Sequence, residues 1–342
     1  MATKKLAKAT DATTPTKAPA PTRKQAVNTK RLASVPPKEV AESYVHRMVS
    51  GQHDFDVFQF ARESKLNMLI EGPTGPGKTM ACRAFAAEND MAFYSIPSNV
   101  GVEPSQLFGK FVPNGSGGFV WVDGPVTDLV KNGGVLLINE VNFMPERVAT
   151  VLFGLLDARR EITLLDHNAE TLKAHDDLLI VADMNPDYEG TRPLNKAFRN
   201  RFAIQLFWDY DPKVEASLIT FPTLRDVIGK LRDQFRTGLI ETPVSTNMGM
   251  EFVRVASALG FDFAVTNFAT HFGADDRNTI SNVFNVVKAE LEQEIEDLEE
   301  LGAEDARIKW AQTAKPGYID PVWGVYGDDW AFEDDEDEEE EE

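Results

Sequence analysis

Short runs of consecutive apolar residues alternate with segments of helical period from residue 37 to about residue 207. Four of these runs have the length of a β-strand, and they lie at residues 67–71, 92–96, 134–139 and 178–184. Residues 79–88, which follow the first run, instead have the pattern of a helix. Because continuous apolar strands separated by helices are typical of a parallel sheet buried on both faces, the pattern predicts an α/β fold.

Two segments within this region predict β-hairpins inserted into the α/β domain. Residues 111–122 have glycine, asparagine and serine between two apolar arms. Residues 161–171 turn around Asp166, His167 and Asn168.

The pattern becomes helical after about residue 211, and it predicts a small helical lid domain behind the sheet domain. The helical segments lie at residues 213–219, 224–238, 248–259 and 277–300. The last helix, at residues 283–301, is so rich in charged residues that we expect it to be exposed.

Composition sets off a tail at each end of the chain. Residues 1–36 are rich in Ala, Thr, Pro and Lys and have almost no large apolar side chains, so we expect them to be disordered. In a second extension, residues 303–342, an aromatic strip at 315–332 either packs on the body or docks a partner, and a disordered acidic run follows. These boundaries leave residues 37–210 as the α/β domain and residues 211–302 as the lid with its C-terminal helix.

The net charge of −20 is unevenly distributed along the chain. The first tail is basic, whereas residues 333–342 are all acidic, and the body between the tails is itself acidic. An acidic body argues against general nucleic-acid binding by the folded part. The basic tail could contact nucleic acid or an acidic partner, or it could simply be solvated.

The cysteines and histidines exclude several kinds of site. The single cysteine, Cys82, excludes an intramolecular disulfide and a cysteine-cluster metal site, and we expect it to be a small buried residue. The histidines lie in different segments without the spacing of metal ligands, so they predict no metal site: His46, His53, His167, His175 and His271. No apolar run approaches the roughly 20 residues of a membrane-spanning helix, and nothing resembles a signal peptide, so we expect a soluble, cytoplasmic protein without membrane contact.

The candidate chemistry begins at residues 72–79, where GPTGPGKT matches the P-loop pattern G-x-x-x-x-G-K-[ST] between a predicted strand and a predicted helix. Its glycines let the loop wrap with N–H groups inward, and the positive end of the helix dipole also attracts phosphate. Lys78 can reach the β- and γ-phosphates, and the Thr79 hydroxyl can ligate Mg²⁺. The motif predicts a site for ATP with Mg²⁺, formed by Gly72, Pro73, Thr74, Gly75, Pro76, Gly77, Lys78, Thr79 and Met80.

Polar residues follow two of the other predicted strands. The strand at 134–139 ends in Asn139 and Glu140, where P-loop ATPases carry an Asp whose carboxylate holds Mg²⁺ and a Glu that activates the attacking water. Glu140 is in register to be this base, whereas Asn139 keeps one ligand oxygen but lacks the charge, so we expect weaker Mg²⁺ binding. Asn185, after the strand at 178–184, could hold the water together with Glu140, and a turn residue before proline is the alternative.

Two arginines, Arg199 and Arg201, lie just before an apolar strand, within the segment PLNKAFRNRF. A guanidinium group that reached a neighbouring subunit's γ-phosphate would stabilise charge in the transition state. Either arginine is a candidate for that role, and surface ion pairing is the alternative for each.

The P-loop, the segment LLINEVN, Asn185 and PLNKAFRNRF together resemble AAA+ ATPases of the MoxR and dynein-related (midasin-like) group, over about residues 60–260. Two longer segments resemble features of this group in particular. SQLFGKFVPNGSGGFVWVDGPVTDLV is similar to its helix-2 insert, and RREITLLDHNAETLKAH is similar to the hairpin before its sensor 1. Asn142 matches the asparagine of its DEIN box.

The resemblance implies an AAA+ nucleotide-binding domain with a helical lid, and a ring of identical subunits, usually a hexamer, with the nucleotide between subunits. Arg201 would then act in trans, since it matches the group's arginine finger better than Arg199 does. The resemblance also implies remodelling or activation of a partner protein, often one with a von Willebrand A domain. In the sensor 2 region, Asn247 stands where relatives have an arginine that contacts the γ-phosphate, and Arg254 is a weak substitute.

Three functions are compatible with these observations. The first is a Mg²⁺-dependent AAA+ ATPase that remodels a bound protein. The second is an ATP-stabilised assembly or scaffold protein with little hydrolysis, which Asn139 and Asn247 suggest. The third is a nucleic-acid motor or loader that uses the basic tail and the hairpins, and the acidic body disfavours it.

Overall fold

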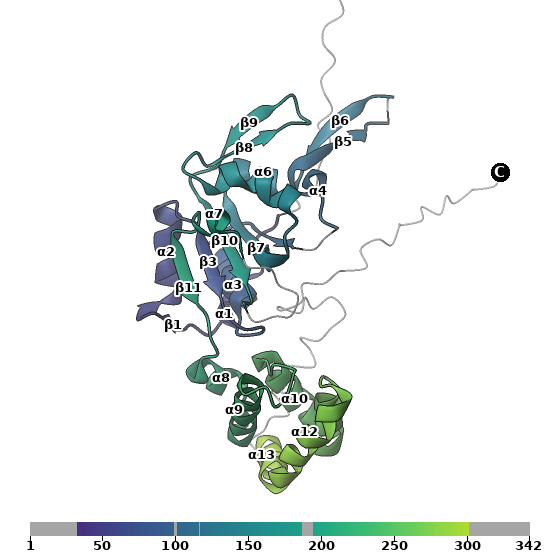
Figure 1. The fold of residues 1–342 in the computed structure, drawn as a ribbon. Coiled ribbons are helices and arrows are strands. Elements are labelled where there is room, and N and C mark those ends of the chain that lie inside the picture. Colours follow the sequence, from purple (N-terminus) through teal and green to yellow (C-terminus); the bar gives the residue numbers. More distant parts are fainter. Residues whose placement is uncertain (1–32, 99–100, 116, 187–193, 301–342) are drawn as a thin grey trace, which may run out of the picture. The chain divides into compact units, whose positions relative to one another are not determined.

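A computed structural model describes residues 33–98, 101–115, 117–186 and 194–300 (Figure 1). The predictions for the acidic run, the aromatic strip and most of the basic tail therefore lie outside the described residues. At the N-terminal edge, Ala33 is buried and the N–H of Phe93 donates to the Ser34 carbonyl at 2.9 Å. Packing against the sheet thus begins before the predicted boundary at residue 37, because Ala33 is an apolar residue that the sheet domain can bury.

The central sheet has five parallel strands in the order β11-β3-β10-β7-β4. Their bounds are β3 Met68–Glu71, β4 Phe93–Pro97, β7 Gly134–Asn139, β10 Leu178–Met184 and β11 Ile204–Phe207. The predicted parallel sheet is therefore confirmed. Its order places β10 between β3, which leads into the P-loop, and β7, which ends in Asn139.

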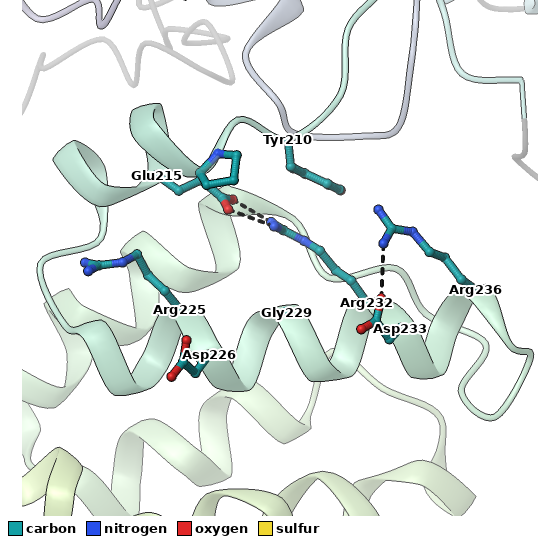
Figure 2. A pocket seen from close by; sticks show the side chains of 9 residues that line it. Tyr210, Glu215, Arg225, Asp226, Gly229, Arg232, Asp233 and Arg236 are labelled. Carbon is teal, nitrogen blue, oxygen red and sulfur yellow. Dashed lines mark hydrogen bonds and ion pairs between the residues drawn. The ribbon is translucent and has the colours of Figure 1, made fainter.

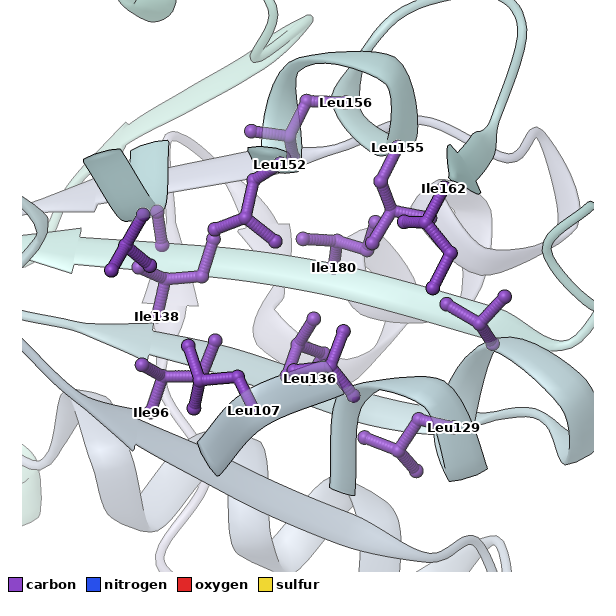
Figure 3. Close-up of a cluster of buried hydrophobic side chains, with 14 of the residues drawn as sticks. Ile96, Leu107, Leu129, Leu136, Ile138, Leu152, Leu155, Leu156, Ile162 and Ile180 are labelled. Carbon is purple, nitrogen blue, oxygen red and sulfur yellow. The ribbon is translucent and has the colours of Figure 1, made fainter. Parts of the chain in front are cut away.

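Helices cover both faces of this sheet, and the side chains of each strand alternate between the two faces. Leu136 and Ile138 of β7 join one core cluster, shown in Figure 3, whereas Val135 and Leu137 join the other. The first cluster includes residues of α4 Pro104–Phe108, α5 Pro125–Asn132 and α6 Glu146–Leu156; the second includes residues of α1 Lys38–Glu42, α2 Asp54–Glu63 and α3 Lys78–Glu88. Burial on both faces explains why the strands are almost continuously apolar in sequence.

Both predicted hairpins are present, each as an antiparallel pair. In the first, β5 Gly109–Pro113 pairs with β6 Phe119–Asp123, and in the second, β8 Glu161–Leu164 pairs with β9 Glu170–Lys173. The indole of Trp121 stacks on the His167 ring at a centroid distance of 4.7 Å, so the two hairpins contact each other. Several elements of the α/β domain were not located from the sequence. The shortest of them are α1, α4, the hairpin of β1 Met48–Val49 and β2 Gln52–His53, the 3₁₀ helix η1 Val141–Phe143, and α7 Lys196–Arg199.

The C-terminal region is helical, as predicted, and we call it the lid. It consists of α8 Pro212–Leu218, α9 Pro222–Arg236, α10 Thr246–Leu259, α11 Phe261–Ala269, α12 Ala274–Val286 and α13 Lys288–Glu300. Helix α11 was not predicted, and the segment at 277–300 is two helices that meet at Val287. The expected exposure of the last helix is only partly correct, because Leu291 of α13 is completely buried in the lid core. Among the described helices, none combines the length and apolar character that crossing a bilayer would take.

Two glycines of the lid give a matched pair of stability predictions. A Cβ atom at Gly229, in α9, would have no heavy atom within 4 Å, so Gly229→Ala should stabilise the protein by about 0.5–1 kcal/mol through helix propensity. A Cβ atom at Gly249, in α10, would lie 2.6 Å from the Cδ1 atoms of Ile219 and Ile228, so Gly249→Ala should cost about 1–3 kcal/mol. Urea denaturation of both variants measures the two effects, and changes of the same sign would contradict this packing.

Candidate nucleotide-binding site

The P-loop connects β3 to α3, and two of its glycines are required by the backbone. Gly77 has φ = 92° and lies at the N-cap of α3, in a region where a side chain is strained. At Gly72, a Cβ atom would lie 2.0 Å from the carbonyl oxygen of Trp208, so the loop has room only for glycine. The loop therefore wraps over the N-terminus of an eleven-residue helix, where N–H groups and the helix dipole favour an anion.

Arg47, a residue that sequence reasoning did not select, holds the P-loop in place through hydrogen bonds. Its guanidinium donates to the carbonyl of Pro76 at 2.6 Å and to that of Asp209 at 2.8 Å, and it lies over the Trp208 ring. The Trp208 indole N–H also donates to the Pro76 oxygen, at 3.3 Å. Arg47 and Trp208 therefore both hold the loop at the Pro76 carbonyl. No local motif marks Arg47, because its partners are backbone carbonyls distant in sequence.

Lys78 is buried at the first position of α3, and its ammonium group is held by the loop itself. Nζ donates to the carbonyls of Gly72 at 2.9 Å and Pro73 at 2.6 Å. Burial lowers the pKa of Lys78, and the nearby carboxylates of Asp183 and Glu140 oppose that shift. A bound phosphate would be a stronger partner than these two neutral carbonyls.

The two predicted residues that follow Lys78 differ in their surroundings. Thr79 is partly exposed in the first turn of α3, as a residue that contributes a hydroxyl to a metal should be. The Met80 side chain instead packs against the core cluster on the α3 face of the sheet. Cys82 is buried, as expected for a small apolar residue.

At the end of β7, Glu140 turns the chain and leaves its side chain exposed. Its φ angle is 51°, in the left-handed region that residues other than glycine seldom adopt. The N–H of Glu140 donates to Oδ1 of Asp183 at 2.6 Å, and this hydrogen bond holds the strained turn. Asn139, the preceding residue, is partly exposed at the last position of the strand.

Asn185 lies at the tip of β10, between the strand that feeds the P-loop and the strand that ends in Asn139. Its amide nitrogen donates to the Thr74 hydroxyl in the P-loop at 2.8 Å. The amide of Asn142 in turn donates to the Asn185 carbonyl at 3.3 Å. The structure thus brings Asn185 to the P-loop, and its role in holding water stays a prediction.

Asp183 is a further residue of this site that sequence reasoning missed. Its carboxyl group is buried on β10, and burial raises its pKa to about 6, although the nearby charge of Lys78 acts in the opposite direction. The available signal was one acid within the otherwise apolar strand LLIVADM. A buried carboxylate is rare unless it is paired, which makes Asp183 a functional candidate.

Comparison with known proteins adds the family. Residues 67–202, which include all of β3, the P-loop, β7, β10 and α7, match the family described as AAA domain (dynein-related subfamily). This part of the chain is therefore similar to AAA domains of that subfamily. Together with the parallel sheet and the P-loop, the match supports a nucleotide-binding AAA+ protein and confirms the resemblance found in the sequence.

Three similar proteins cover different shares of this chain. An uncharacterised protein of Staphylococcus aureus (strain USA300) is 35% identical over 142 residues, 40% of this chain and 54% of its own, so the chain spans about half the length of that relative. An uncharacterised protein of Staphylococcus haemolyticus is 27% identical over 242 residues, 69% of this chain and 87% of its own. A candidate ATPase from Cytophaga hutchinsonii has a TM-score of 0.42 and 20% identity, over 71% of this chain and 82% of its own.

The two candidate arginines of the AAA domain have different contacts. Arg199 forms an ion pair with Glu71 of β3 and also donates to Gln205 at 3.2 Å. The guanidinium of Arg201 instead lies over the ring of Phe153, 4.2 Å from its centroid. Neither contact tests action in trans, which stays a prediction for both residues.

In the sensor 2 region, Ser245 caps α10, and its hydroxyl accepts a hydrogen bond from the Met248 N–H at 3.2 Å. Asn247 is partly buried in the first turn of this helix, and Arg254 is exposed further along it. The role of Arg254 as a substitute therefore also remains a prediction.

A pocket of about 360 Å³ lies among residues of α8, α9 and the segment before them (Figure 2). Four of the six charged residues that line it form ion pairs, Arg232 with Glu215 and Arg236 with Asp233, and Arg225 donates to the Ile219 carbonyl. Because these charges already satisfy each other, we interpret the pocket as part of the lid's own framework rather than as a second binding site.

The prediction that the histidines lie apart is wrong for His46 and His53. Their Nδ1 atoms lie 3.2 and 3.3 Å from Oδ1 of the buried Asp54, because the β1–β2 hairpin folds the intervening residues back. Asp54 also accepts hydrogen bonds from the Tyr44 hydroxyl and from the N–H groups of Arg47 and Phe55. With its oxygens engaged by so many donors, we interpret Asp54 as a junction that fixes the segment carrying Arg47.

The residues around the P-loop fit a magnesium–nucleotide complex. The helix N-terminus and Lys78 suit the phosphates, while the Thr79 hydroxyl and the Asn139 amide oxygen are hard oxygen ligands of the type that Mg²⁺ prefers. Asp183 adds a buried carboxyl group next to them, which accepts a hydrogen bond from the Glu140 N–H.

Proposed function

We propose that this protein binds ATP with Mg²⁺ at the P-loop, hydrolyses it, and uses the cycle as a ring of identical subunits to remodel a protein partner. The observation that carries this proposal is the convergence of Lys78, Glu140 and Asn185 on one end of the sheet. Burial raises the pKa of the Asp183 carboxyl group, the charge of Lys78 lowers it, and the Glu140 N–H donates a hydrogen bond to that group. The Asn185 amide donates a hydrogen bond to Thr74 in the P-loop.

Each residue has a distinct role in this proposal. Lys78 and the P-loop amides bind the phosphates, and Thr79 and Asn139 hold the metal ion. When bound, Mg²⁺ neutralises charge that develops on the phosphate oxygens. Glu140 accepts a proton from the attacking water, and Asn185 orients that water.

Arg201 is the better candidate for completing a neighbouring subunit's site. For Arg199 to act in trans, its ion pair with the Glu71 carboxylate would have to break. Arg201 would give up its position over the Phe153 ring and a hydrogen bond to the Ala197 carbonyl, but it has no ion pair to break in the described part of the chain. The ring, usually a hexamer in the MoxR group, follows from the resemblance to that group.

The proposed partner is a protein rather than nucleic acid. A body with a large negative charge repels phosphate backbones. The similarity to the MoxR group favours a partner with a von Willebrand A domain, which the ring would remodel or activate.

Phosphate release measured together with mass by light scattering tests this function. The full chain should release phosphate only with Mg²⁺, and its mass should rise to that of a ring when ATP is added. Lys78→Ala should lose both properties, because it removes the charge that binds the β- and γ-phosphates.

Two other outcomes would favour the alternatives. Assembly that needs ATP without phosphate release would identify an ATP-stabilised scaffold instead, for which Asn139 and Asn247 are the motivating residues. Stimulation by DNA that is lost on deletion of residues 1–36 would identify a nucleic-acid motor.

A further inference from the structure

Asp183 is a buried acid in the AAA domain to which neither the P-loop motif nor the polar strand ends assign a role. Its exposed fraction is only 3%, and the rest of β10 is apolar apart from this residue. Burying a carboxylate is costly unless hydrogen bonds or charges compensate. The position therefore calls for partners, and the neighbouring strand provides them.

Strand register places Asp183 beside Asn139. Ala182 of β10 pairs with Ile138 of β7 in a parallel ladder, so Asp183 and Asn139 are the next residues on adjacent strands. Two residues earlier on each strand, Val181 and Leu137 both join the core cluster on the α3 face. Because side chains alternate with a period of two, Asp183 and Asn139 point to that same face, which is the face of Lys78.

Hydrogen bonds then connect the two residues and the one that follows. When the Asn139 amide is oriented to satisfy its hydrogen bonds, its nitrogen donates to Oδ2 and Oδ1 of Asp183, at 3.1 and 3.0 Å. The Glu140 N–H donates to the same Oδ1 at 2.6 Å. Since Asp183 engages the amide nitrogen, the Asn139 oxygen is the atom left over for a cation.

We propose that Asp183 supplies from β10 the negative charge that Asn139 lacks at the end of β7, and that it positions Asn139 and Glu140 for the metal–nucleotide complex. This inference rests on the proposed function of the P-loop site. Asp183 acts through its neighbours, because its buried carboxylate accepts hydrogen bonds from the Asn139 amide and from the Glu140 N–H. In this proposal, the negative charge that P-loop ATPases carry at the position of Asn139 on β7 is instead carried by Asp183 on the adjacent strand β10.

A relocated charge has an unusual consequence for Asn139→Asp. This substitution recreates the Asp-Glu pair of P-loop ATPases, yet it would place two carboxylates about 3 Å apart, and like charges at that distance cannot both ionise. The exchange Asn139→Asp with Asp183→Asn restores one acid and one amide, with their strands swapped. If the site needs one carboxylate among the two positions, metal binding should be retained in the exchanged double variant and not improved by Asn139→Asp alone.

The experiment measures metal and nucleotide binding separately, with no need for turnover. Electron paramagnetic resonance gives the affinity for Mn²⁺ in the complex with a non-hydrolysable ATP analogue, and fluorescence of mant-ATP in EDTA gives the affinity for nucleotide alone. Asp183→Asn should weaken Mn²⁺ binding about tenfold without weakening nucleotide binding in EDTA. Asn139→Asp should not bind Mn²⁺ more tightly than the wild type, and the exchanged double variant should return to within about threefold of it.

The matched control is Asp166→Asn, which removes a carboxylate from the exposed turn of the β8–β9 hairpin and should change neither affinity. Mn²⁺ affinity that is unchanged in Asp183→Asn, or increased in Asn139→Asp, would overturn the role of Asp183 while the proposed function stands. A wild-type protein that binds neither mant-ATP nor Mn²⁺ would overturn both. Should Asp183→Asn fail to fold, the Mn²⁺ affinities of the exchanged double variant and of Asn139→Asp are compared instead. A double variant that binds Mn²⁺ no more tightly than Asn139→Asp contradicts the proposal.

Discussion

Replacing Glu140 by glutamine should give a protein that binds ATP and releases almost no phosphate. Glutamine keeps the size of the side chain but cannot accept a proton from water, and a positioned general base contributes about 10²–10⁴-fold to a rate. The substitution should leave the P-loop intact, because the backbone at this position is held by the Asp183 carboxylate and not by the Glu140 side chain. Phosphate release at saturating ATP and mant-ATP affinity measure the two properties in one preparation.

Glu146 provides the control for this variant. It is an exposed glutamate in the first turn of α6, six residues further along the chain, and Glu146→Gln should hydrolyse ATP at the wild-type rate. Turnover close to wild type in Glu140→Gln would show that another group activates water. Loss of ATP binding in the same variant would mean that Glu140 shapes the site and does not act as its base.

The sheet could be predicted because its signal is local. Each strand is a short apolar run, and burial on both faces makes that run almost continuous, as in Leu178–Met184 of β10. The P-loop was equally accessible, since its glycines are required by contacts and dihedral angles that any such loop shares. The lid was harder to divide. Helix α11 follows α10 after a single residue, Gly260, and periodicity alone does not locate so short a break.

The parts of the site that were missed depend on contacts between distant segments. Arg47 binds the carbonyls of Pro76 and Asp209, and neither partner has a sequence signature. Asp183 was visible as an acid in an apolar strand, but its meaning required the register of β10 against β7. Once that register is known, the period of two along each strand brings Asp183 to Asn139. The apparent loss of charge at Asn139 then has a structural explanation in its neighbour.

The lid contains a buried ion pair that connects three of its segments (Figure 2). Two guanidinium nitrogens of Arg232 donate to the two carboxylate oxygens of Glu215, at 2.9 and 2.7 Å. The Thr246 hydroxyl donates to the same carboxylate at 2.6 Å, and the Arg232 Nε–H donates to the Val244 carbonyl at 2.8 Å. Tyr210 covers the guanidinium, with its ring centroid 3.4 Å away. Helices α8 and α9 and the start of α10 therefore share one polar network.

Glu215→Gln is expected to destabilise the protein by about 3–5 kcal/mol, because it leaves the buried charge of Arg232 without a partner. The two side chains are only 9% and 11% exposed, so solvent cannot replace the lost interaction. Urea denaturation followed by far-ultraviolet circular dichroism measures the change. Asp262→Asn is the control: it breaks an ion pair with Lys288 in which the aspartate is 83% exposed, and it should cost no more than about 1 kcal/mol. Equal effects of the two substitutions would show that the Glu215–Arg232 pair does not hold the lid together. A double variant that also replaces Arg232 by methionine should lose less stability than the sum of the two single substitutions.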